Sequence, residues 1–321
     1  MNIGLTLPNR GVLFGATTVP EMLEMAETAE RSGAFASVWV GDSLLGKPRL
    51  ESIALLAAVA ARTRRVRIGP ACMASFVLRD PVLLAYQWAS LDLIAKGRTV
   101  LVACTGIIPQ EGGKIEGQLY GVTAKDRVGR LIEWIKLIRR LWTEDNVTFE
   151  GEHYHCSGIT VDPKPARKPA PPIWIANNSR ADRATIERTH RRVARHADGW
   201  QTSISDPADA AWRIADVRAK VAAAGRDPAT LETHLYHNIN VGSDRTAALA
   251  ESKRFLDTYY ATDFAPGFVA DWTAAGTPEE CAQHLRVFQR MGFSEITLRC
   301  TSWDQRGQLE RVITGVLPLL G

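Results

Sequence analysis

Short runs of apolar and β-branched residues alternate with longer segments of helical periodicity along the whole chain. In the segment that starts near Thr123, apolar residues recur every three or four positions through Leu131, Ile135, Ile138 and Trp142, which is the pattern of an amphipathic helix. Eight runs have the length and composition of strands: Asn2–Leu7, Ser37–Gly41, Val66–Cys72, Thr99–Cys104, Ile173–Ala176, Gly199–Ser203, Thr233–Val241 and Glu295–Cys300.

This alternation predicts an α/β fold whose strands close into a (β/α)8 TIM barrel. Eight parallel strands, each followed by a helix, are typical of that barrel, whereas a doubly wound open sheet usually has a glycine fingerprint after its first strand. Here the first strand ends in Leu7-Pro8-Asn9-Arg10-Gly11, which lacks the GxGxxG spacing. Because about 250 residues suffice for one barrel, we expect residues 1–321 to form a single domain.

Two gaps between predicted strands exceed one helical unit, so we expect insertions after strands four and seven. Residues Asn146–Ile159, in the first gap, have the pattern of a two-stranded hairpin around Gly151-Glu152. The second gap predicts an aromatic loop with room for a short helix, because Pro266-Gly267 is surrounded by Tyr259, Tyr260, Phe264, Phe268 and Trp272. Helix starts are predicted at Asp80-Pro81, at Asp206-Pro207 and at Thr277-Pro278-Glu279-Glu280, the last with the spacing of a capping box.

Composition and charge narrow the class of protein. Hydrophobic residues make up 45% of the chain and charged residues 23%, which excludes disorder as the main state. A net charge of +4 is too small to indicate a nucleic-acid or membrane partner. The chain shows no basic leader and no apolar stretch near the roughly 20 residues of a membrane span, so we expect a soluble, cytoplasmic protein. Five widely spaced cysteines favour reduced thiols, and we expect no metal site.

In a (β/α)8 barrel, active sites lie at the C-terminal ends of the strands. The residues at those ends are Asn9, Arg10, Asp42, Ser43, Ala71–Ser75, Thr105, Gly106, Asn177–Arg180, Thr202 and Ser203. This set holds no carboxylate pair for glycoside hydrolysis and no histidine cluster for a metal hydrolase, so hydrolysis is not indicated. At its strand end, Asp42 is expected to orient a catalytic group, with capping of the next turn as the alternative.

The segment Trp174–Arg180 suggests an anion site. A strand breaks there into the small polar residues Asn177, Asn178 and Ser179 before a predicted helix. Free backbone N–H groups, a hydroxyl and the helix dipole would together suit a phosphate. The alternative is an ordinary helix N-cap with nothing bound, and spacing alone does not separate the two.

Several longer segments resemble a known family. They are Gly33–Asp42, Ala60–Gly69, Leu91-Asp92 with Lys96-Gly97-Arg98, Pro172–Ala176, Ala197–Trp200 and Gly276–Glu280. In this order they are similar to segments of the bacterial luciferase-like monooxygenases, from the first strand to the last helix.

The resemblance implies a (β/α)8 barrel, often dimeric, that binds reduced FMN or the deazaflavin coenzyme F420 at the strand C-terminal ends. The family's non-proline cis peptide, which supports the flavin ring, falls by position on Ala71–Cys72. The cofactor phosphate would lie against Asn177, Asn178 and Ser179, where the anion site was predicted. We accordingly expect a homodimer whose cofactor-binding residues are Ala71, Cys72, Thr105, Gly106, Asn177, Asn178 and Ser179.

The chain also departs from the family pattern. Many members have a histidine directly after the strand-two aspartate, where this chain has Ser43. The fourth strand usually ends with a glycine in place of Cys104, and the deazaflavin-dependent sugar-phosphate dehydrogenases have a catalytic glutamate where this chain has Ile107. Sugar-phosphate oxidation is therefore not expected.

Our leading hypothesis is a flavin-dependent monooxygenase in which reduced FMN, supplied by a separate reductase, reacts with O2 and oxygenates a small organic substrate. Asp42 and Ser43 would hydrogen-bond near the reacting edge of the ring, and the insertion Tyr259–Trp272 would exclude water. The alternative is an F420-dependent reductase or dehydrogenase that transfers a hydride without oxygen. A third hypothesis, a non-catalytic flavin-binding protein, is supported by the departures at Ser43 and Ile107.

Overall fold

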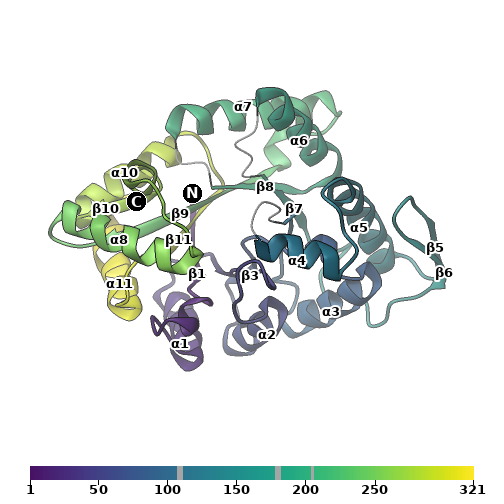
Figure 1. The fold of residues 1–321 in the computed structure, drawn as a ribbon, viewed down its shortest axis with the longest axis horizontal. Helices are drawn as coiled ribbons and strands as arrows, with labels where there is room; N and C mark the ends of the chain where they lie inside the picture. The colour runs from purple at the N-terminus through teal and green to yellow at the C-terminus, as the bar shows by residue number, and fades with distance from the viewer. Residues whose placement is uncertain (107–110, 178–181, 204–205) are drawn as a thin grey trace.

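A computed structural model describes residues 1–106, 111–177, 182–203 and 206–321. Its longest sheet lies at the centre and its helices surround it (Figure 1). The strands are β1 (Asn2–Leu7), β2 (Ser37–Val40), β3 (Arg67–Pro70), β4 (Leu101–Ala103), β5 (Val147–Glu150), β6 (His155–Ile159), β7 (Ile173–Ala176), β8 (Gly199–Thr202), β9 (Glu232–Val241), β10 (Thr273–Gly276) and β11 (Glu295–Cys300). The α-helices are α1 (Val19–Ser32), α2 (Ser52–Arg62), α3 (Pro81–Ile94), α4 (Glu111–Leu119), α5 (Asp126–Thr143), α6 (Arg183–His196), α7 (Pro207–Ala223), α8 (Arg245–Tyr260), α9 (Pro266–Asp271), α10 (Pro278–Arg290), α11 (Gln305–Arg311) and α12 (Leu317–Leu320).

The central strands form a nearly closed parallel barrel. Their order is β3-β2-β1-β11-β9-β8-β7-β4, and β10 pairs with β9 beside this path. Two isolated parallel bridges, Ile68 with Thr99 and Met73 with Ala103, connect the regions of β3 and β4, the first and last strands of this order. All eight predicted strands are present, which confirms the predicted α/β barrel of TIM type.

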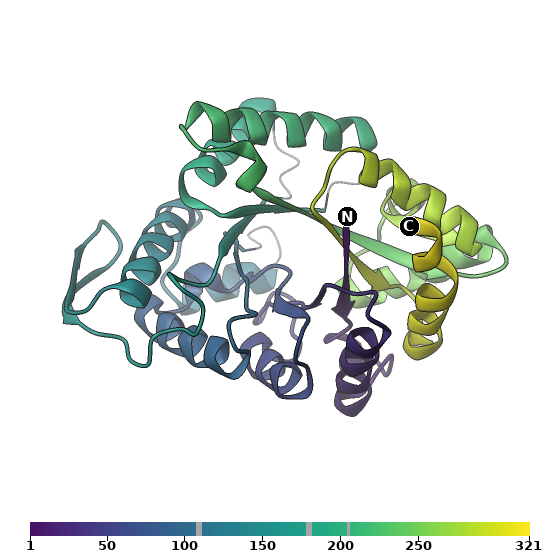
Figure 2. The ribbon, with the colours of Figure 1, turned by 180° about the vertical axis from the view of Figure 1, so that it is seen from behind.

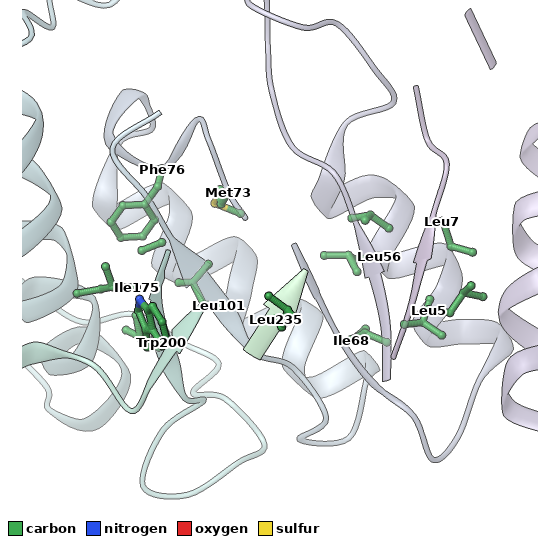
Figure 3. Packing of buried hydrophobic residues seen from close by; sticks show 14 of the residues in the cluster. Leu5, Leu7, Leu56, Ile68, Met73, Phe76, Leu101, Ile175, Trp200 and Leu235 are labelled. Carbon is green, nitrogen blue, oxygen red and sulfur yellow. The ribbon is translucent and has the colours of Figure 1, made fainter. Parts of the chain in front are cut away.

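Side chains alternate between the inside of the barrel and the layer beneath the helices, because successive residues of a strand point to opposite faces. On β11, Ile296, Leu298 and Cys300 belong to the main apolar cluster between strands and helices. Figure 3 shows part of that cluster, including Leu5 and Leu7 of β1, Ile68 of β3 and Leu56 of α2. The alternate positions of β11, Glu295, Thr297 and Arg299, therefore face the interior at three successive depths.

Glu295 anchors a polar network at the N-terminal base of the barrel. Its Oε1 accepts hydrogen bonds from Ser37 Oγ (2.5 Å) and Trp39 Nε1 (2.8 Å). Its Oε2 accepts from Arg67 Nη2 (2.9 Å), and His234 Nε2 lies 3.3 Å from Oε1. Burial alone would raise the pKa of Glu295, but His234 and Arg67 outweigh it and lower the pKa to about 2. Since this end of a barrel serves stability, we interpret the network as structural.

The first insertion contains the predicted hairpin. Strands β5 and β6 pair antiparallel, and the hairpin projects from the side of the molecule beyond α5 in both views (Figure 1, Figure 2). It lies away from the centre of the barrel, so it does not contribute to the barrel mouth.

The second insertion contains the predicted short helix, α9, and one strand that the sequence did not predict. β10 has the sequence Thr-Ala-Ala-Gly, whose small residues have little strand propensity. It forms because β9 is ten residues long: β8 pairs only with Glu232–Leu235, and the free edge from Asn238 to Val241 accepts β10.

Helix starts agree with the prediction. Thr277 and Glu280 form the expected capping box of α10, and Asp80 and Asp206 cap α3 and α7 through their side chains. Within the described ranges, no helix combines the length and apolar character needed to cross a bilayer.

Candidate functional site

Asp42, directly after β2, is 6% exposed and holds two loops of the barrel mouth together. Its carboxylate accepts hydrogen bonds from Ser52 Oγ (2.7 Å) and from both the backbone N–H (2.8 Å) and the hydroxyl (2.7 Å) of Ser75. Arg79 Nη2 lies 3.3 Å from its Oδ1. These partners join the loop after β2 to the segment after β3. The geometry is that of a positioning residue, and direct catalysis by Asp42 stays a prediction.

Two other predicted residues also organise the loop after β2. Ser43 Oγ accepts a hydrogen bond from the backbone N–H of Lys47 (2.9 Å). The buried Asn9 side chain donates to Gly41 O (2.8 Å) and accepts from Gly41 N–H (3.1 Å). Its Oδ1 also lies 3.4 Å from the hydroxyl of Tyr259 on α8. These contacts fix the path of residues 41–51 across the mouth.

A shelf of small residues lies at the ends of β3 and β7. We call Ala71, Cys72 and Ala176 the apolar shelf, since all three pack against one buried cluster. That cluster consists of Trp39, Val100, Val102 and Trp174. The Ala71–Cys72 peptide bond is cis, as the family resemblance implied.

The turn after β4 requires a glycine. Gly106 has φ +78°, and a Cβ there would lie 2.6 Å from Ala74 O. Arg127 of α5, buried and not predicted as a site residue, holds this turn by donating from Nη1 to Thr105 O (2.8 Å). A hydrogen bond with Cys104 and burial raise the pKa of the Cys72 thiol well above its usual range. Cys72 is therefore a neutral, apolar surface rather than a nucleophile.

The end of β7 is only partly described. Asn177 is buried, and its backbone N–H donates to Gln201 O (2.8 Å). Asn178, Ser179 and Arg180 lie outside the described residues. The next helix, α6, starts at Arg183, and its N-cap is Asp182, whose side chain accepts a hydrogen bond from Thr185 N–H (3.0 Å). Asn177 is therefore not the N-cap of α6. Phosphate binding at Asn177–Ser179 stays a prediction.

The second insertion packs beside the apolar shelf. We call Tyr236, Tyr260, Phe264, Phe268 and Trp272 the aromatic wall, since they form one cluster that also contacts Ala71. The ring centroids of Trp272 lie 5.4 Å from Phe268 and 6.0 Å from Tyr260. Trp272 Nε1 donates to Tyr236 O (3.1 Å), which ties the wall to β9.

Arg299 of β11 lies fully buried behind this wall. Its Nη2 donates to Asn238 Oδ1 (2.7 Å) and its Nη1 to Tyr260 Oη (2.7 Å). Its guanidinium carbon lies 4.7 Å from the ring centroid of Tyr259 and 4.8 Å from that of Tyr260. Burial lowers the pKa of Arg299, but the surrounding tyrosines raise it above the ordinary arginine value, so the side chain stays charged.

Lys47, in the loop after β2, reaches the same wall. It is 8% exposed, and its Nζ lies 4.5 Å from the Tyr260 ring centroid. Burial and the positive charges of Arg49, Arg10 and Arg299 lower the pKa of Lys47 to about 8. Sequence reasoning missed Lys47 and Arg299. The available signal was the polar residue at every second position of the last strand, and the last of these residues, Arg299, lies near the C-terminal end of the strand.

Together these features suit a flat, partly apolar ligand. The shelf offers small residues against which a ring can lie, and the wall supplies aromatic surface that excludes water. In the part of the chain that the structure describes, no group of three or more His, Cys, Asp or Glu side chains could hold a metal ion.

Comparisons with known proteins bear on the family and the fold of the chain. The sequence profile described as luciferase-like monooxygenase matches residues 1–295. The F420-dependent glucose-6-phosphate dehydrogenase of Nakamurella multipartita is 28% identical and aligns with 94% of this chain and 92% of its own. Monooxygenase RslO1 from Streptomyces bottropensis has a TM-score of 0.81 at 22% identity over 100% of both chains. An F420-dependent secondary alcohol dehydrogenase, solved with an F420–acetone adduct, has a TM-score of 0.82 at 19% identity, covering 100% of this chain and 99% of its own. At these identities, the two structures show a shared fold.

Proposed function

The chain belongs to the luciferase-like monooxygenase family, a family of oxidoreductases, and from this premise we propose that it transfers a hydride between coenzyme F420 and an organic substrate. The observation that carries the proposal is the likeness, over 94% of the chain, to a dehydrogenase named as F420-dependent. This reverses our preference from sequence, which favoured reduced FMN and O2 and kept F420 as the alternative.

The residues at the mouth fit a deazaflavin ring. A tricyclic ring with one polar edge needs a flat surface free of bulky side chains, and Ala71, Cys72 and Ala176 supply one. Gly106 has no side chain, so the turn after β4 adds no bulk next to this surface. Thr105 and Asn177 follow the neighbouring strands β4 and β7, and their polar groups would serve the ring edge or the phosphate. FMN shares the flat ring and a phosphate, so this fit supports both cofactors equally.

When bound, F420 would supply a carbon that accepts or donates a hydride. The protein would orient the reactants and exclude water. The apolar shelf would support the ring, while Asp42 keeps Ser75 and the loop after β2 in register around it. The aromatic wall would close the substrate side. Tyr260, whose hydroxyl accepts a hydrogen bond from Arg299, is the residue we propose to hold a proton next to the substrate.

We propose a substrate other than a sugar phosphate. The family resemblance leads one to expect a histidine acid/base at the position of Ser43. The Ser43 hydroxyl accepts a hydrogen bond from the backbone N–H of Lys47. Ile107, at the expected glutamate position, lies outside the described residues. We also retain the homodimer as a proposal: Leu83 and Tyr86 of α3 are 54% and 49% exposed and offer apolar surface for a second copy.

The competing function is a reduced-FMN monooxygenase with O2 and a separate reductase, favoured by the family's description. The two are separated by anaerobic titration of the purified protein with reduced F420 and, in parallel, with reduced FMN, followed by rapid mixing with oxygenated buffer. We expect F420 to bind more tightly and its reduced form to persist in oxygen. Tighter FMN binding with a transient oxygenated flavin spectrum would refute hydride transfer from F420. Binding of either cofactor without turnover of any acceptor would revive the non-catalytic hypothesis.

A further inference from the structure

Basic side chains converge on one sector of the barrel mouth without acidic partners. Arg10 follows β1, Lys47 and Arg49 follow β2, and Arg299 is the penultimate residue of β11. Because β2, β1 and β11 are neighbours in the barrel, their C-terminal ends bring these residues to the same side. No carboxylate lies within 4.0 Å of any of the four in the described part of the chain.

The four side chains form a connected group, which we call the cationic cluster. Arg10 Nη1 donates to Pro48 O (2.8 Å) and Arg49 Nε to Lys47 O (3.0 Å), so both arginines hold the loop that carries Lys47. Arg49 lies 5.6 Å from the Tyr259 ring centroid, and Lys47 lies over Tyr260. Arg299 donates to the hydroxyl of the same Tyr260.

Nearby acidic residues are already engaged elsewhere. Asp42 and Glu51 both pair with Arg79, at 3.3 and 2.7 Å. Glu116 accepts a hydrogen bond from Gly46 N–H (2.7 Å), one residue before Lys47, and does not form an ion pair with it. Lys47 Nζ has no hydrogen-bond acceptor among the described residues, although the side chain is buried. An ammonium on a largely buried side chain, with only an aromatic face as partner, can be compensated further by an anion.

We infer that the cationic cluster, through Lys47 and Arg49, binds an anionic group, a carboxylate or a phosphoryl group, of the substrate, next to an aromatic or apolar body that lies on the partly exposed ring of Tyr260. Arg299 is fully buried and adds positive charge through its hydrogen bond to Tyr260 without contacting the ligand. This inference rests on the proposed function, because it takes the mouth as the substrate site. The cofactor phosphate is predicted at the end of β7, which stands opposite β1 in the strand order. The cationic cluster is therefore separated from that position by the width of the barrel.

Several contacts favour an aromatic acid over a simple inorganic ion. Lys47 stands against the face of Tyr260, so an anion that reached its ammonium would bring its neighbouring atoms against that ring. Cation and ring surfaces together recognise a charged end and a flat body in one ligand.

The test compares benzoate and benzyl phosphate with neutral benzyl alcohol by isothermal titration calorimetry, on the full chain loaded with F420. We expect both anions to bind at least about tenfold more tightly than the alcohol, as charge-assisted hydrogen bonds allow. Lys47→Met should weaken anion binding about tenfold and leave the alcohol unchanged. The matched control is Lys136→Met, an exposed lysine on the outer face of α5.

Arg49→Met provides a second variant should Lys47→Met fail to fold. Equal affinity for benzoate and benzyl alcohol would overturn the inference, as would unchanged anion affinity in both variants. Competition between F420 and benzoate in the unloaded protein would also overturn it, since it would assign the cluster to the cofactor.

The two proposals fail separately. If F420 binds and the anion preference is missing, only the inference about the substrate fails. If F420 does not bind, the same titrations are made on the unloaded protein; an anion preference that depends on Lys47 there leaves the anion site standing, and only the cofactor assignment fails.

Discussion

Replacing Glu295 with glutamine should destabilise the barrel by about 3 kcal/mol at neutral pH, and the loss should vanish in acid. The carboxylate accepts hydrogen bonds from Ser37, Trp39 and Arg67 and is fully buried. Glutamine keeps the shape and one acceptor oxygen but removes the charge that faces Arg67. Removing one partner of a buried ion pair costs about 3–5 kcal/mol, and the retained oxygen favours the lower end.

The pKa of Glu295 gives an independent magnitude. Its value of about 2 in the folded state, against the ordinary 4.5, corresponds to roughly 3 kcal/mol of folding free energy above pH 5. Because the folded pKa is depressed, this stabilisation is present above the unfolded pKa and is lost as the pH falls from about 4.5 towards 2. The wild-type protein should therefore approach the stability of the variant over that range.

Urea unfolding followed by tryptophan fluorescence and circular dichroism, at pH 7, 5, 4 and 3, would measure the difference. A melting experiment should show a decrease of about 5 °C at pH 7, given about 2.1 cal/mol/K of unfolding entropy per residue. The matched control is Glu232→Gln, which removes the other carboxylate on Arg67; its side chain is 34% exposed, so we expect a loss below about 1 kcal/mol. If Glu295→Gln lowers the free energy of unfolding equally at pH 7 and pH 3, the stabilisation does not come from the negative charge of Glu295, and the reasoning is refuted.

Three further predictions concern the mouth. Gly106→Ala forces a side chain into φ +78° and against Ala74 O, so we expect about 1–2 kcal/mol lower stability and weaker F420 binding; unchanged F420 affinity would remove this turn from the cofactor site. Asp42→Ala leaves Ser52 and Ser75 without their acceptor, so stability should fall by about 3 kcal/mol in chemical unfolding, and a loss under about 1 kcal/mol would contradict the clamp. Since the pKa of Lys47 is lowered to about 8 by burial and by neighbouring cations, an anion should raise it, and benzoate binding near pH 8.5 should take up protons. Calorimetry in buffers of different ionisation enthalpy measures the uptake, and identical heats in all buffers would argue against contact with Lys47.

The barrel was predictable from the sequence because its outward-facing strand positions are apolar and its helix starts carry local capping signals. Ile296 and Leu298 follow the two-residue period of a strand, and Thr277 with Glu280 marks a helix start without tertiary information. β10 was not predictable, because its Thr-Ala-Ala-Gly segment becomes a strand only where β9 offers an unpaired edge.

The site was predictable only as a set of strand ends. The barrel rule located Asp42, Ala71 and Gly106 at the mouth, but it did not give the partners that determine what each side chain does. Lys47 lies in a loop whose path depends on Asn9 and Arg10, and Arg299 is buried by rings from another element. Convergence of charges from separate strands is a three-dimensional property, which neither periodicity nor spacing encodes.

The pairing of β10 with β9 also has a consequence for the thermodynamics of ligand binding. Asn238 donates to Trp272 O from its backbone N–H (3.2 Å) and from its side-chain Nδ2 (2.9 Å), while Gly242 N–H donates to Gly276 O (2.8 Å). The C-terminal end of the aromatic wall, at Trp272, is thus held to the barrel by backbone hydrogen bonds between β10 and β9. The conformational entropy of ordering these rings is lost when the chain folds, so a ligand that binds against them does not bear that loss again. Affinity on this side of the mouth should consequently follow the match of shape and charge, with little contribution from rearrangement of the wall.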